Sequence, residues 1–588
     1  MRSSPYIKSC PHHLQRILEG KRLLLWREIL VDLEYPDVAV IDDICSGFKL
    51  TGWAPSTGVF RPDVRRPSLG LQQLISMSKG LNASVVNSLQ GAVESEHDQF
   101  VWDETMTEVD RGWLAPSSME GECFVAKRFP VPQKDKVRLV DDFTICGVNG
   151  AYGLREKLRV QAVDELCAYL AFRLDQFPSG CLPKLTGRTY DLKSAYKQFG
   201  VDKWHAERLK IAVKRPGGGV GIFAALALPF GASGSVSSFL RVAASLTYIG
   251  VVALQVLWTS FFDDYTCVCV EGEETNVSFY VESLFRLLGV WFAETGSKAT
   301  SFGPSFKSLG VIFDVGAIPD GTFTLQHTES RKSELVQFLD NLMRAQRATP
   351  KELERLHGRL IWFSAFVFGR TMNQLVKNIS LESLQKKKVI SFTSEFLQTL
   401  TDLKHAIGSS KPVVISKTLC TTWYVFTDGA YEPDSDVLAS VGAVLISLTG
   451  TPVQCFGEVV PKTFVDELLQ HSSHPIYELE VLPVVMATRL WMKYLTGCPT
   501  VYFLDNVAAR ATYIKGVGAT PPSIPLLKDF VRLEARLRIY SWFGRVPSHS
   551  NVADSPSRLV FDDPVLSGCP RVRIVLPTHI HEIGDGSG

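Results

Sequence analysis

The chain has 588 residues, too many for a single hydrophobic core, so several domains are expected. A hydrophobic content of 45% with 21% charged residues indicates a folded chain and excludes an intrinsically disordered one. The formal net charge is only +1, so binding to a polyanion would have to depend on a local basic track.

Signals for targeting and for disulfide bonds are absent from the sequence. The N-terminus has no apolar signal core, and the longest apolar run, near 249–258, is too short to span a bilayer. The twelve cysteines are scattered without a Cys-x-x-Cys pair, which favours reduced structural thiols. We therefore expect an intracellular protein of the cytoplasm or the nucleus, with no signal peptide and no transmembrane segment.

The first 95 residues carry no motif with recognisable chemistry. His12–Leu33 has the apolar spacing of a helix, with basic residues interspersed. Gly52–Gly70 is rich in glycine, proline and arginine, which indicates a loop. Residues 1–95 are therefore expected to form an N-terminal extension of unknown role.

Two strand-like runs follow a short predicted helix near 103–112. They are Phe124–Pro132 and Val137–Phe143, with the basic tip Gln133–Lys136 between them. A basic hairpin tip suits the binding of phosphate, because Lys and Arg pair with phosphate oxygens. The glycine-rich run 217–221 has no following Lys-Ser or Lys-Thr, so we expect a hairpin turn there and not a phosphate-binding loop.

Two adjacent acids, Asp263 and Asp264, lie between apolar strand-like runs, at the tip of a predicted β-hairpin. Like charges side by side are tolerated where water or divalent cations neutralise them. For a lone Asp-Asp pair, an ordinary turn is the alternative. A third acid, Asp191, lies at the end of a predicted strand in the run Leu185–Gln198. The three carboxylates could together hold two Mg²⁺ ions about 3.5–4 Å apart for phosphoryl transfer.

Three segments in this order resemble the palm motifs of reverse transcriptases. Asp191–Tyr196 resembles the first palm motif, Leu228–Phe239 the motif that contacts template and nucleotide, and Phe261–Asp264 the double-aspartate motif. The combination is similar to the polymerases of long-terminal-repeat or tyrosine-recombinase (DIRS-type) retrotransposons and of pararetroviruses. This resemblance implies a right-hand polymerase with fingers, palm and thumb.

The resemblance also implies roles for the matched residues. The catalytic metal ligands would be Asp191, Asp263 and Asp264. The residues in contact with the incoming dNTP would be Lys134, Arg138, Tyr196, Phe230, Gly231 and Lys298. Tyr196 would be the steric gate that excludes a ribose 2′-hydroxyl, with a core tyrosine as the alternative. Two positions depart from the family pattern: Thr144 stands where an Arg is common, and Val236 where many relatives have Pro.

A thumb is expected after the palm. Arg331–Leu342 and Pro350–Phe366 have the amphipathic spacing of helices. The segment Glu329–Lys388 has 12 Lys and Arg against 6 Asp and Glu, a local excess of +6. Such a charge run is usually a solvated face, and on a polymerase it would hold the phosphates of a duplex.

A second ordered set of acids lies beyond residue 416. Its members are Asp428, Glu480, Asp505 and Asp554. Each alone has an alternative as a turn or cap residue, but the ordered set resembles that of ribonuclease H, which implies a second two-metal site. Glu478 competes with Glu480 as the acid of the helix, and we favour Glu480. His549 resembles the mobile product-release histidine of that family, which many retroelement relatives lack.

The sequence therefore predicts a mixed α+β and α/β multidomain protein. The expected segments are an N-terminal extension at 1–95, fingers and palm at 96–320, thumb and connection at 321–415, an RNase H-like α/β domain at 416–560 and a C-terminal tail at 561–588. The expected function is that of an RNA-directed DNA polymerase that also cleaves the RNA strand of RNA–DNA hybrids. Its cofactors would be two Mg²⁺ or Mn²⁺ ions per active site. Its partners would be an RNA template, a DNA primer, RNA–DNA hybrid and dNTPs, without a membrane.

Two alternatives remain open at this point. A decayed or domesticated copy would bind nucleic acid as a scaffold without chemistry, and the loss of a metal-binding acid would mark it. All seven candidate acids are present. The other alternative is a polymerase without a useful nuclease. The sequence leaves open the retroelement class, the primer, the oligomeric state and whether the chain is part of a longer polyprotein.

Overall fold

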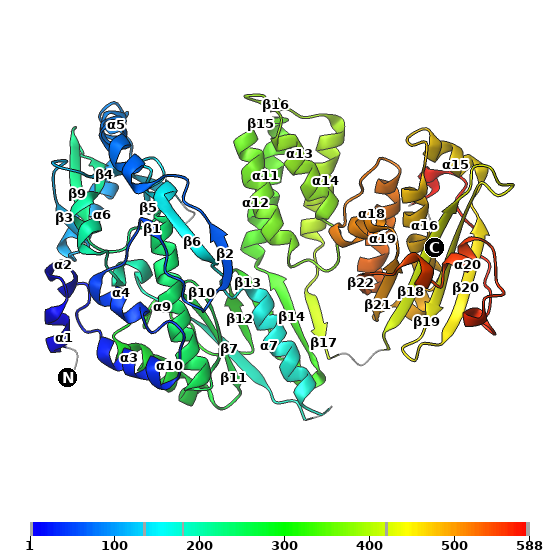
Figure 1. Ribbon diagram of the computed structural model, residues 1–588, viewed down its shortest axis with the longest axis horizontal. Helices are drawn as coiled ribbons and strands as arrows, with labels where there is room; N and C mark the ends of the chain where they lie inside the picture. The colour runs from blue at the N-terminus through cyan, green and yellow to red at the C-terminus, as the bar shows by residue number, and fades with distance from the viewer. Residues whose placement is uncertain (1–3, 133–136, 179–180, 418–420, 584–588) are drawn as a thin grey trace. The chain divides into compact units, whose positions relative to one another are not determined.

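The structure is a computed structural model, and it describes residues 4–132, 137–178, 181–417 and 421–583 (Figure 1). Helices and strands alternate along the chain, which confirms the predicted mixed α/β multidomain class. The chain divides into two compact units. The first consists of Met1–Leu309 with Phe313–Phe323, and the second of Gly310–Ile312 with Thr324–Gly588.

The N-terminal extension contributes to the hydrophobic core of the first unit. Its elements are α1 (Ser4–Ser9), α2 (His12–Gln15), α3 (Leu23–Asp32), α4 (Val40–Ser46), β1 (Gly52–Trp53), β2 (Arg61–Arg65) and α5 (Leu71–Gln90). Leu14, Trp26 and Ile41 are fully buried in the same cluster as Phe199 and Trp258. The extension therefore folds together with the residues that follow it.

The predicted fingers region contains a five-stranded sheet in the order β3-β9-β8-β4-β5. The elements here are α6 (Asp98–Asp110), β3 (Leu114–Pro116), β4 (Phe124–Pro132), β5 (Val137–Asp142), β6 (Tyr152–Lys157), α7 (Val163–Gln176), α8 (Lys203–Arg208), β8 (Leu209–Lys214) and β9 (Val220–Ala225). β8 and β9 are antiparallel, with Lys214 opposite Val220, and Gly217–Gly219 have positive φ. The predicted glycine-rich hairpin turn is confirmed.

The predicted palm is built on a three-stranded antiparallel sheet in the order β10-β11-β7. Its elements are β7 (Leu185–Asp191), α9 (Ser233–Val252), β10 (Leu257–Phe261), β11 (Asp264–Val270), α10 (Glu274–Leu288), β12 (Ser305–Ser308) and β13 (Val311–Asp314). Among the helices described, α9 alone is long and apolar enough to cross a membrane by length and composition. It is weak evidence, because a core helix passes the same test and 72% of its most apolar window is buried.

Four helices stand side by side as a bundle in the second unit (Figure 1). The elements are β14 (Thr322–His327), α11 (Glu329–Ala345), β15 (Arg347–Ala348), α12 (Pro350–Ser364), α13 (Asn373–Ser383), β16 (Ile390–Ser391), α14 (Ser394–Gly408) and β17 (Val413–Ser416). α12 begins after Thr349, whose hydroxyl accepts a hydrogen bond from the Glu352 N–H. Leu339, Leu360 and Leu403 are fully buried between the helices. The two predicted thumb helices are thus present as α11 and α12.

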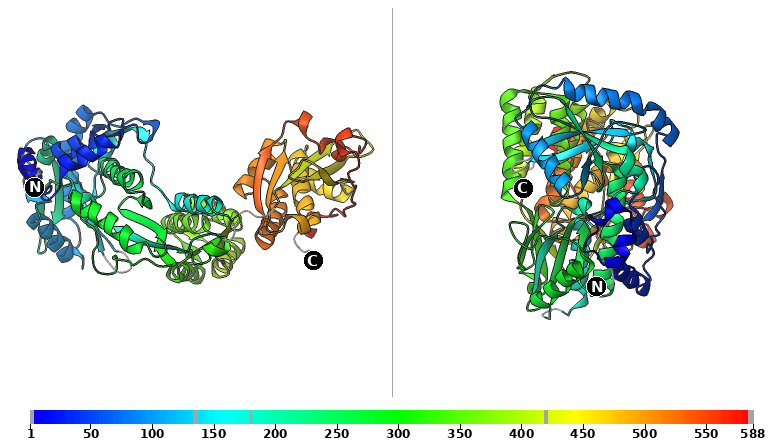
Figure 2. Two further views of the ribbon diagram at one scale, coloured as in Figure 1. Left: turned by 90° about the horizontal axis from the view of Figure 1, so that it is seen from below. Right: turned by 90° about the vertical axis from the view of Figure 1, so that its left-hand side faces the viewer.

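The last part of the chain is a five-stranded sheet in the order β20-β19-β18-β21-β22, which Figure 2 shows from a second direction. Its elements are β18 (Trp423–Tyr431), β19 (Ala439–Ile446), β20 (Pro452–Val459), α15 (Lys462–Leu469), α16 (Ile476–Leu490), α17 (Met492–Leu495), β21 (Pro499–Leu504), α18 (Val507–Lys515), α19 (Ser523–Leu537), β22 (Tyr540–Arg545) and α20 (Asp554–Ser557). β18 to β20 are antiparallel, whereas β18, β21 and β22 are parallel. A Cβ atom on Gly429 would lie 2.5 Å from the Leu479 carbonyl oxygen, so glycine is required where α16 meets β18.

Candidate active sites

The first acidic cluster lies at one end of the β10-β11-β7 sheet. β10 and β11 form the predicted hairpin, with Phe261 opposite Asp264. β11 pairs with β7 so that Asp264 lies opposite Asp191. The Leu192 N–H donates to the Asp263 carbonyl oxygen at 2.9 Å. The strand register therefore brings all three candidate aspartates to the same end of the sheet.

The environment of this cluster disfavours three simultaneous negative charges. Burial, together with the charges of Asp263 and Asp191, raises the pKa of Asp264 to about 6. Burial, with the charge of Asp191 adding to it, also raises the pKa of Asp263. The Lys298 ammonium group makes an ion pair with Asp191 and opposes both shifts. Divalent cations would complete the neutralisation that Lys298 begins.

The predicted nucleotide-contacting residues lie on two neighbouring segments. Tyr196 is 9% exposed, and its ring centroid lies 4.8 Å from that of Phe230 and 4.9 Å from that of Phe239. Burial raises the pKa of Tyr196 well above its usual value. Gly231 has a φ of +103°, and a Cβ atom there would lie 2.0 Å from the Asp141 carbonyl oxygen. Glycine is therefore the residue that this backbone position accepts.

Of the predicted triphosphate-binding cations, the structure describes two. Arg138 is exposed on β5, and its charge lowers the pKa of Asp263, which places it close to the acidic cluster. Lys298 contacts Asp191 directly. Lys134 lies outside the described residues. Two of the three predicted cations thus lie near the carboxylate cluster. A bound triphosphate would need positive charges there to pair with its oxygens.

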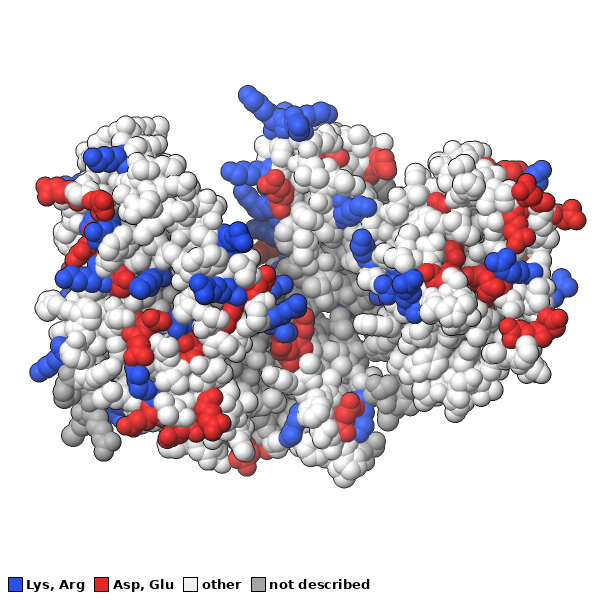
Figure 3. All heavy atoms as spheres, viewed as in Figure 1, with Lys and Arg blue, Asp and Glu red and all other residues white. Residues whose placement is uncertain are grey.

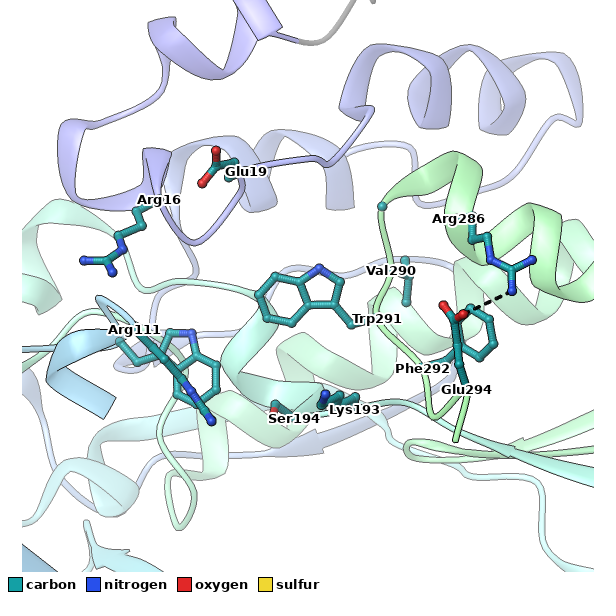
Figure 4. A pocket seen from close by; sticks show the side chains of 12 residues that line it. Arg16, Glu19, Arg111, Lys193, Ser194, Arg286, Val290, Trp291, Phe292 and Glu294 are labelled. Carbon is teal, nitrogen blue, oxygen red and sulfur yellow. Dashed lines mark hydrogen bonds and ion pairs between the residues drawn. The ribbon is translucent and has the colours of Figure 1, made fainter. Parts of the chain in front are cut away.

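A pocket of about 790 Å³ opens next to the first palm motif (Figure 4). Its lining includes the cations Arg16, Arg111, Lys193 and Arg286 and the aromatic residues Trp113, Trp291 and Phe292. In Figure 4 the Trp291 indole lies between the side chains of Arg16 and Arg286. The Arg286 guanidinium group donates a hydrogen bond to Glu294 at 3.2 Å. None of the three palm aspartates lines this pocket. No local sequence pattern predicts this pocket, because its cations come from segments far apart in the chain.

A buried lysine of the N-terminal extension supports the loop beside this pocket. The Lys21 ammonium group is fully buried and donates to Gln198 Oε1 at 3.2 Å and to the Gly289 carbonyl at 3.0 Å. Gln198 in turn donates to the carbonyls of Lys193 and Trp291, both at 2.9 Å. Burial lowers the pKa of Lys21 to about 7. The extension thereby positions the loop that follows the first palm acid.

The second acidic cluster is assembled from two parallel strands and a helix. Phe426 of β18 pairs with Phe503 of β21, so Asp428 and Asp505, each two residues further along, lie at the same sheet end. Glu480 is buried on α16. One carboxylate oxygen from each of these three acids lies within 4.8 Å of the others. Three of the four predicted acids of this set, Asp428, Glu480 and Asp505, are thus brought together from positions up to 77 residues apart.

Burial and mutual repulsion dominate the electrostatics of this second cluster. Burial, with the charges of Asp428 and Asp505 adding to it, raises the pKa of Glu480 to about 10. Burial also raises the pKa of Asp428 to about 7, despite a hydrogen bond from Ser557. Glu480 therefore favours the protonated form at neutral pH, and Asp428 is about half protonated there, unless a cation is bound.

Three hydrogen-bond donors hold these carboxylates, and the sequence interpretation had assigned none of them a role. Asn551 Nδ2 donates to Asp428 Oδ1 at 3.2 Å, and Ser557 Oγ donates to Asp428 Oδ2 at 2.5 Å. Ser548 Oγ donates to Asp505 Oδ2 at 2.8 Å. The only available signal was that all three polar residues flank Asp554 closely in sequence.

The other candidates near this cluster take different positions. Glu478 is buried but accepts a hydrogen bond from Thr520 Oγ1 at 2.7 Å, and it is not part of the carboxylate group. Asp554 is partly exposed and makes an ion pair with Arg558 at 3.2 Å. Its charge still raises the pKa of Asp428, so it lies near the cluster. His549 is exposed on the loop before Asp554.

The donor set of the second cluster fits a hard divalent cation. Glu480 Oε2 and Asp505 Oδ1 are buried and accept no hydrogen bond from any donor in the described parts of the chain. All ligand atoms are carboxylate oxygens, which Mg²⁺ and Mn²⁺ prefer. The palm aspartates offer the same ligand type, but across the described ranges they do not form a group with all ligand atoms within 4.8 Å.

Comparison with known proteins gives matches among solved structures only. No family model matches the chain, and no curated protein matches it. A structure of foamy viral protease-reverse transcriptase dRH with double-stranded DNA has a TM-score of 0.42 and 12% identity, covering 89% of this chain and 82% of that one. The foamy viral enzyme with RNA/DNA hybrid has a TM-score of 0.43 and 15% identity, covering 83% and 57%. The same enzyme with double-stranded DNA has a TM-score of 0.41 and 14% identity, covering 87% and 93%. Any function must therefore be argued from the geometry of the two clusters.

Proposed function

We propose that this protein is the reverse transcriptase of a retrotransposon-like element, with a ribonuclease H activity that cuts the RNA strand of RNA–DNA hybrids. The observation that carries the proposal is the presence of two separate carboxylate clusters, each at the end of a sheet. Asp191 lies opposite Asp264 in one, and Asp428, Glu480 and Asp505 converge in the other. Two-metal phosphoryl chemistry needs such clusters. The substrates are an RNA template, a DNA primer and dNTPs.

In the proposed polymerase site, acidic residues bind the metal ions and basic residues neutralise the charge of the triphosphate. Asp191, Asp263 and Asp264 would hold the two cations. When bound, such cations activate the attacking hydroxyl group and stabilise the charge on the phosphate oxygens. Lys298 and Arg138 balance the charge of the triphosphate, and Lys134 is proposed as a further clamp.

The sugar and the base of the incoming nucleotide face the aromatic part of this site. Tyr196 and Phe230 present adjacent rings, and Gly231 allows the backbone to approach closely. A tyrosine ring at this place leaves no room for a ribose 2′-hydroxyl, so dNTPs are selected over rNTPs. The exposed fraction of Phe230 is 40%, which leaves its ring available to a base.

In the nuclease site, Asp428, Glu480, Asp505 and Asp554 would hold the cations. Bound cations there would activate water as the nucleophile. Asn551 and Ser557 orient the two oxygens of Asp428, and Ser548 orients Asp505. Because these hydrogen bonds fix the carboxylates before any ion binds, the site is preorganised for the hybrid strand.

The helical bundle supplies a basic surface for duplex phosphates. Lys351, Arg355 and Arg359 are exposed at intervals of four residues on α12, so they lie on one face of that helix. Figure 3 shows Lys and Arg side chains gathered over the bundle. Such a stripe can neutralise backbone phosphates without reading sequence. Although the net charge of the chain is only +1, this stripe is a local basic surface to which a duplex could bind.

Primer extension on an RNA template with dNTPs and Mg²⁺ or Mn²⁺ tests the polymerase assignment. Extension that disappears in Asp263→Asn, while the variant still binds hybrid, supports it. The scaffold alternative predicts that folded wild-type protein binds hybrid and extends neither RNA-templated nor DNA-templated primers. A polymerase without a useful nuclease would extend the primer and leave the hybrid uncut.

A further inference from the structure

The chain beyond the RNase H-like sheet folds back onto that domain. The Val572 N–H donates to the Cys455 carbonyl at 2.8 Å, and the Cys455 N–H donates to the Pro570 carbonyl at 3.0 Å. Further along, Leu576 and Ile583 are buried in the core of the domain. Segment 570–583 is therefore attached to the domain along its length, and Val572, Ile574 and Leu576 alternate there with more exposed residues.

One point of this attachment brings together two imidazoles and a carboxylate. Glu467 on α15, His579 and His581 each offer a ligand atom, and these atoms all lie within 4.8 Å of one another. His579 Nδ1 lies 2.5 Å from Glu467 Oε1. The rings of His579 and His581 are stacked, with centroids 5.3 Å apart. None of these residues belongs to either acidic cluster of the proposed function.

The surrounding backbone fixes the segment that carries the two histidines. The Ile580 N–H donates to Glu467 Oε2 at 2.9 Å, and the Thr578 N–H donates to Glu582 Oε2 at 2.7 Å. Thr463 Oγ1 donates to the Thr578 carbonyl at 2.7 Å. The histidines are therefore presented to Glu467 by a chain segment that is already bound to α15.

We propose that Glu467, His579 and His581 form a binding site for a transition-metal ion of the zinc class. Imidazole nitrogens with one carboxylate are typical ligands of Zn²⁺, whereas the all-oxygen clusters elsewhere in the chain suit Mg²⁺ or Mn²⁺. In a tetrahedral zinc site the ligand atoms are about 3.4 Å apart, and the three ligand atoms here lie no more than 4.8 Å from one another. Water can fill the fourth position, because His581 is exposed.

A bound ion would link the segment that carries His579 and His581 to α15, because it would be coordinated by both. A metal that binds only the folded arrangement stabilises it by mass action, so Zn²⁺ would raise the melting temperature of the domain. The inference is independent of the catalytic assignments, because it requires neither polymerase nor nuclease activity. Its structural consequence is a domain whose C-terminal segment is held by a metal as well as by its buried side chains.

The test uses the full-length protein freed of metal with a chelator and then placed in excess Mg²⁺, which occupies the carboxylate clusters. Zn²⁺ is titrated against a chromophoric competitor, and Co²⁺ is used as a spectroscopic probe of imidazole coordination. We expect one Zn²⁺ per chain to bind at this site and to raise the melting temperature. His581→Ala should weaken that binding at least about tenfold.

Further variants separate metal binding from a simple hydrogen-bonded contact. His579→Ala and Glu467→Gln should also weaken Zn²⁺ binding and remove the Zn²⁺-dependent rise in melting temperature. His471→Ala with His474→Ala removes two exposed histidines just after α15 and should leave both readouts unchanged. Unchanged Zn²⁺ affinity in His581→Ala and His579→Ala would overturn the proposal. So would a wild-type melting temperature that Zn²⁺ does not raise.

Discussion

The two acidic clusters are built from the same kind of residue but are neutralised differently. In the predicted palm, Lys298 contacts Asp191, and the pKa of Asp264 is raised only to about 6. In the predicted RNase H-like domain, one carboxylate oxygen each of Asp428, Glu480 and Asp505 lies within 4.8 Å of the others, and no Lys or Arg in the described ranges makes an ion pair with these three acids. The pKa of Glu480 is raised there to about 10.

In the first cluster, a lysine of the chain neutralises part of the negative charge of the carboxylates. The second cluster depends on bound cations for this neutralisation. The carboxylates of the predicted palm have Lys298 as a neighbouring positive charge, and their oxygens do not form a group within 4.8 Å. We expect a bound nucleotide and its metal ions to draw these carboxylates together. The carboxylates of the second cluster are already gathered. Hydrogen bonds from Asn551 and Ser557 and the charge of Arg558 offset part of their repulsion, and protonation of Glu480 offsets more of it when no cation is bound. Cleavage should therefore depend on metal and on pH more steeply than extension does.

Glu480→Gln should give the largest effect, because it removes the most strongly repelled carboxylate. We expect hybrid cleavage to fall at least about a hundredfold, with primer extension retained. The same change should raise the free energy of unfolding in a chelator at pH 7.5 by on the order of 1–3 kcal/mol, since the folded state no longer binds a proton there. Cleavage assays and chemical denaturation measure the two effects.

Glu478→Gln is the matched control for this variant, two residues earlier on the same helix and also buried. It keeps an amide oxygen that can accept the hydrogen bond from Thr520, and it should keep cleavage within a few-fold. If Glu478→Gln abolishes cleavage and Glu480→Gln does not, the assignment of the helix acid is wrong.

The pH dependence of the two activities should differ in the direction set by the carboxyl pKa values. Metal binding needs the deprotonated acids, so apparent Mg²⁺ affinity rises with pH and is lost as pH falls through each raised pKa. For extension this rise should be nearly complete above the Asp264 value of about 6. For cleavage it should continue through the Asp428 value of about 7 toward the Glu480 value of about 10. Half-saturating Mg²⁺ concentrations measured from pH 6 to 9 would contradict this account if both curves had the same midpoint.

Neutralising the basic stripe on α12 should weaken both activities together, because both need the same duplex. The triple variant Lys351→Gln, Arg355→Gln, Arg359→Gln should bind hybrid roughly tenfold more weakly at low salt, with the log–log salt slope reduced by about 2 to 3. Fluorescence anisotropy at several salt concentrations measures both quantities.

A charge-matched triple variant of exposed lysines in the first unit controls for net charge. It changes Lys79, Lys184 and Lys203 to Gln. Equal losses of affinity in the two triple variants would show that α12 has no special role and that only the total charge matters.

The smallest effect concerns only one of the two clusters. Tyr196→Ala should raise the incorporation of rNTPs relative to dNTPs by about tenfold or more, because the ring no longer excludes the 2′-hydroxyl. Tyr196→Phe keeps the ring and should leave the ratio unchanged. A lower overall rate with an unchanged ratio in Tyr196→Ala would assign Tyr196 to the core, where Phe230 and Phe239 surround it.

The sequence was most informative where candidate catalytic residues lie next to a local apolar pattern that predicts a strand or a helix. Apolar strand-like runs on both sides of Asp263 and Asp264 predicted the hairpin, and the structure confirms it. The convergence of Asp428, Glu480 and Asp505 was predicted only through a family resemblance. Their roles, like those of the palm acids and the five segment boundaries, stay predictions until activity is measured.

Contacts between distant segments were not visible in the sequence. Lys21 reaches Gln198 across 177 positions, and His579 reaches Glu467 across 112. Such pairings depend on the tertiary packing of apolar faces, not on a local period. The sequence likewise left Ser557 without a role, because a serine becomes a carboxylate partner only when the chain folds it against Asp428.

If one chain carries two independent sites, each activity should be lost without the other, and a single assay with both strands labelled can show this. An RNA template annealed to a DNA primer, labelled on both strands, is incubated with dNTPs and Mg²⁺ and with wild type, Asp263→Asn or Asp428→Asn. The account predicts extension and RNA cleavage by wild type, cleavage without extension by Asp263→Asn, and extension without cleavage by Asp428→Asn. Loss of both activities in either folded variant, or neither activity in wild type, would contradict it.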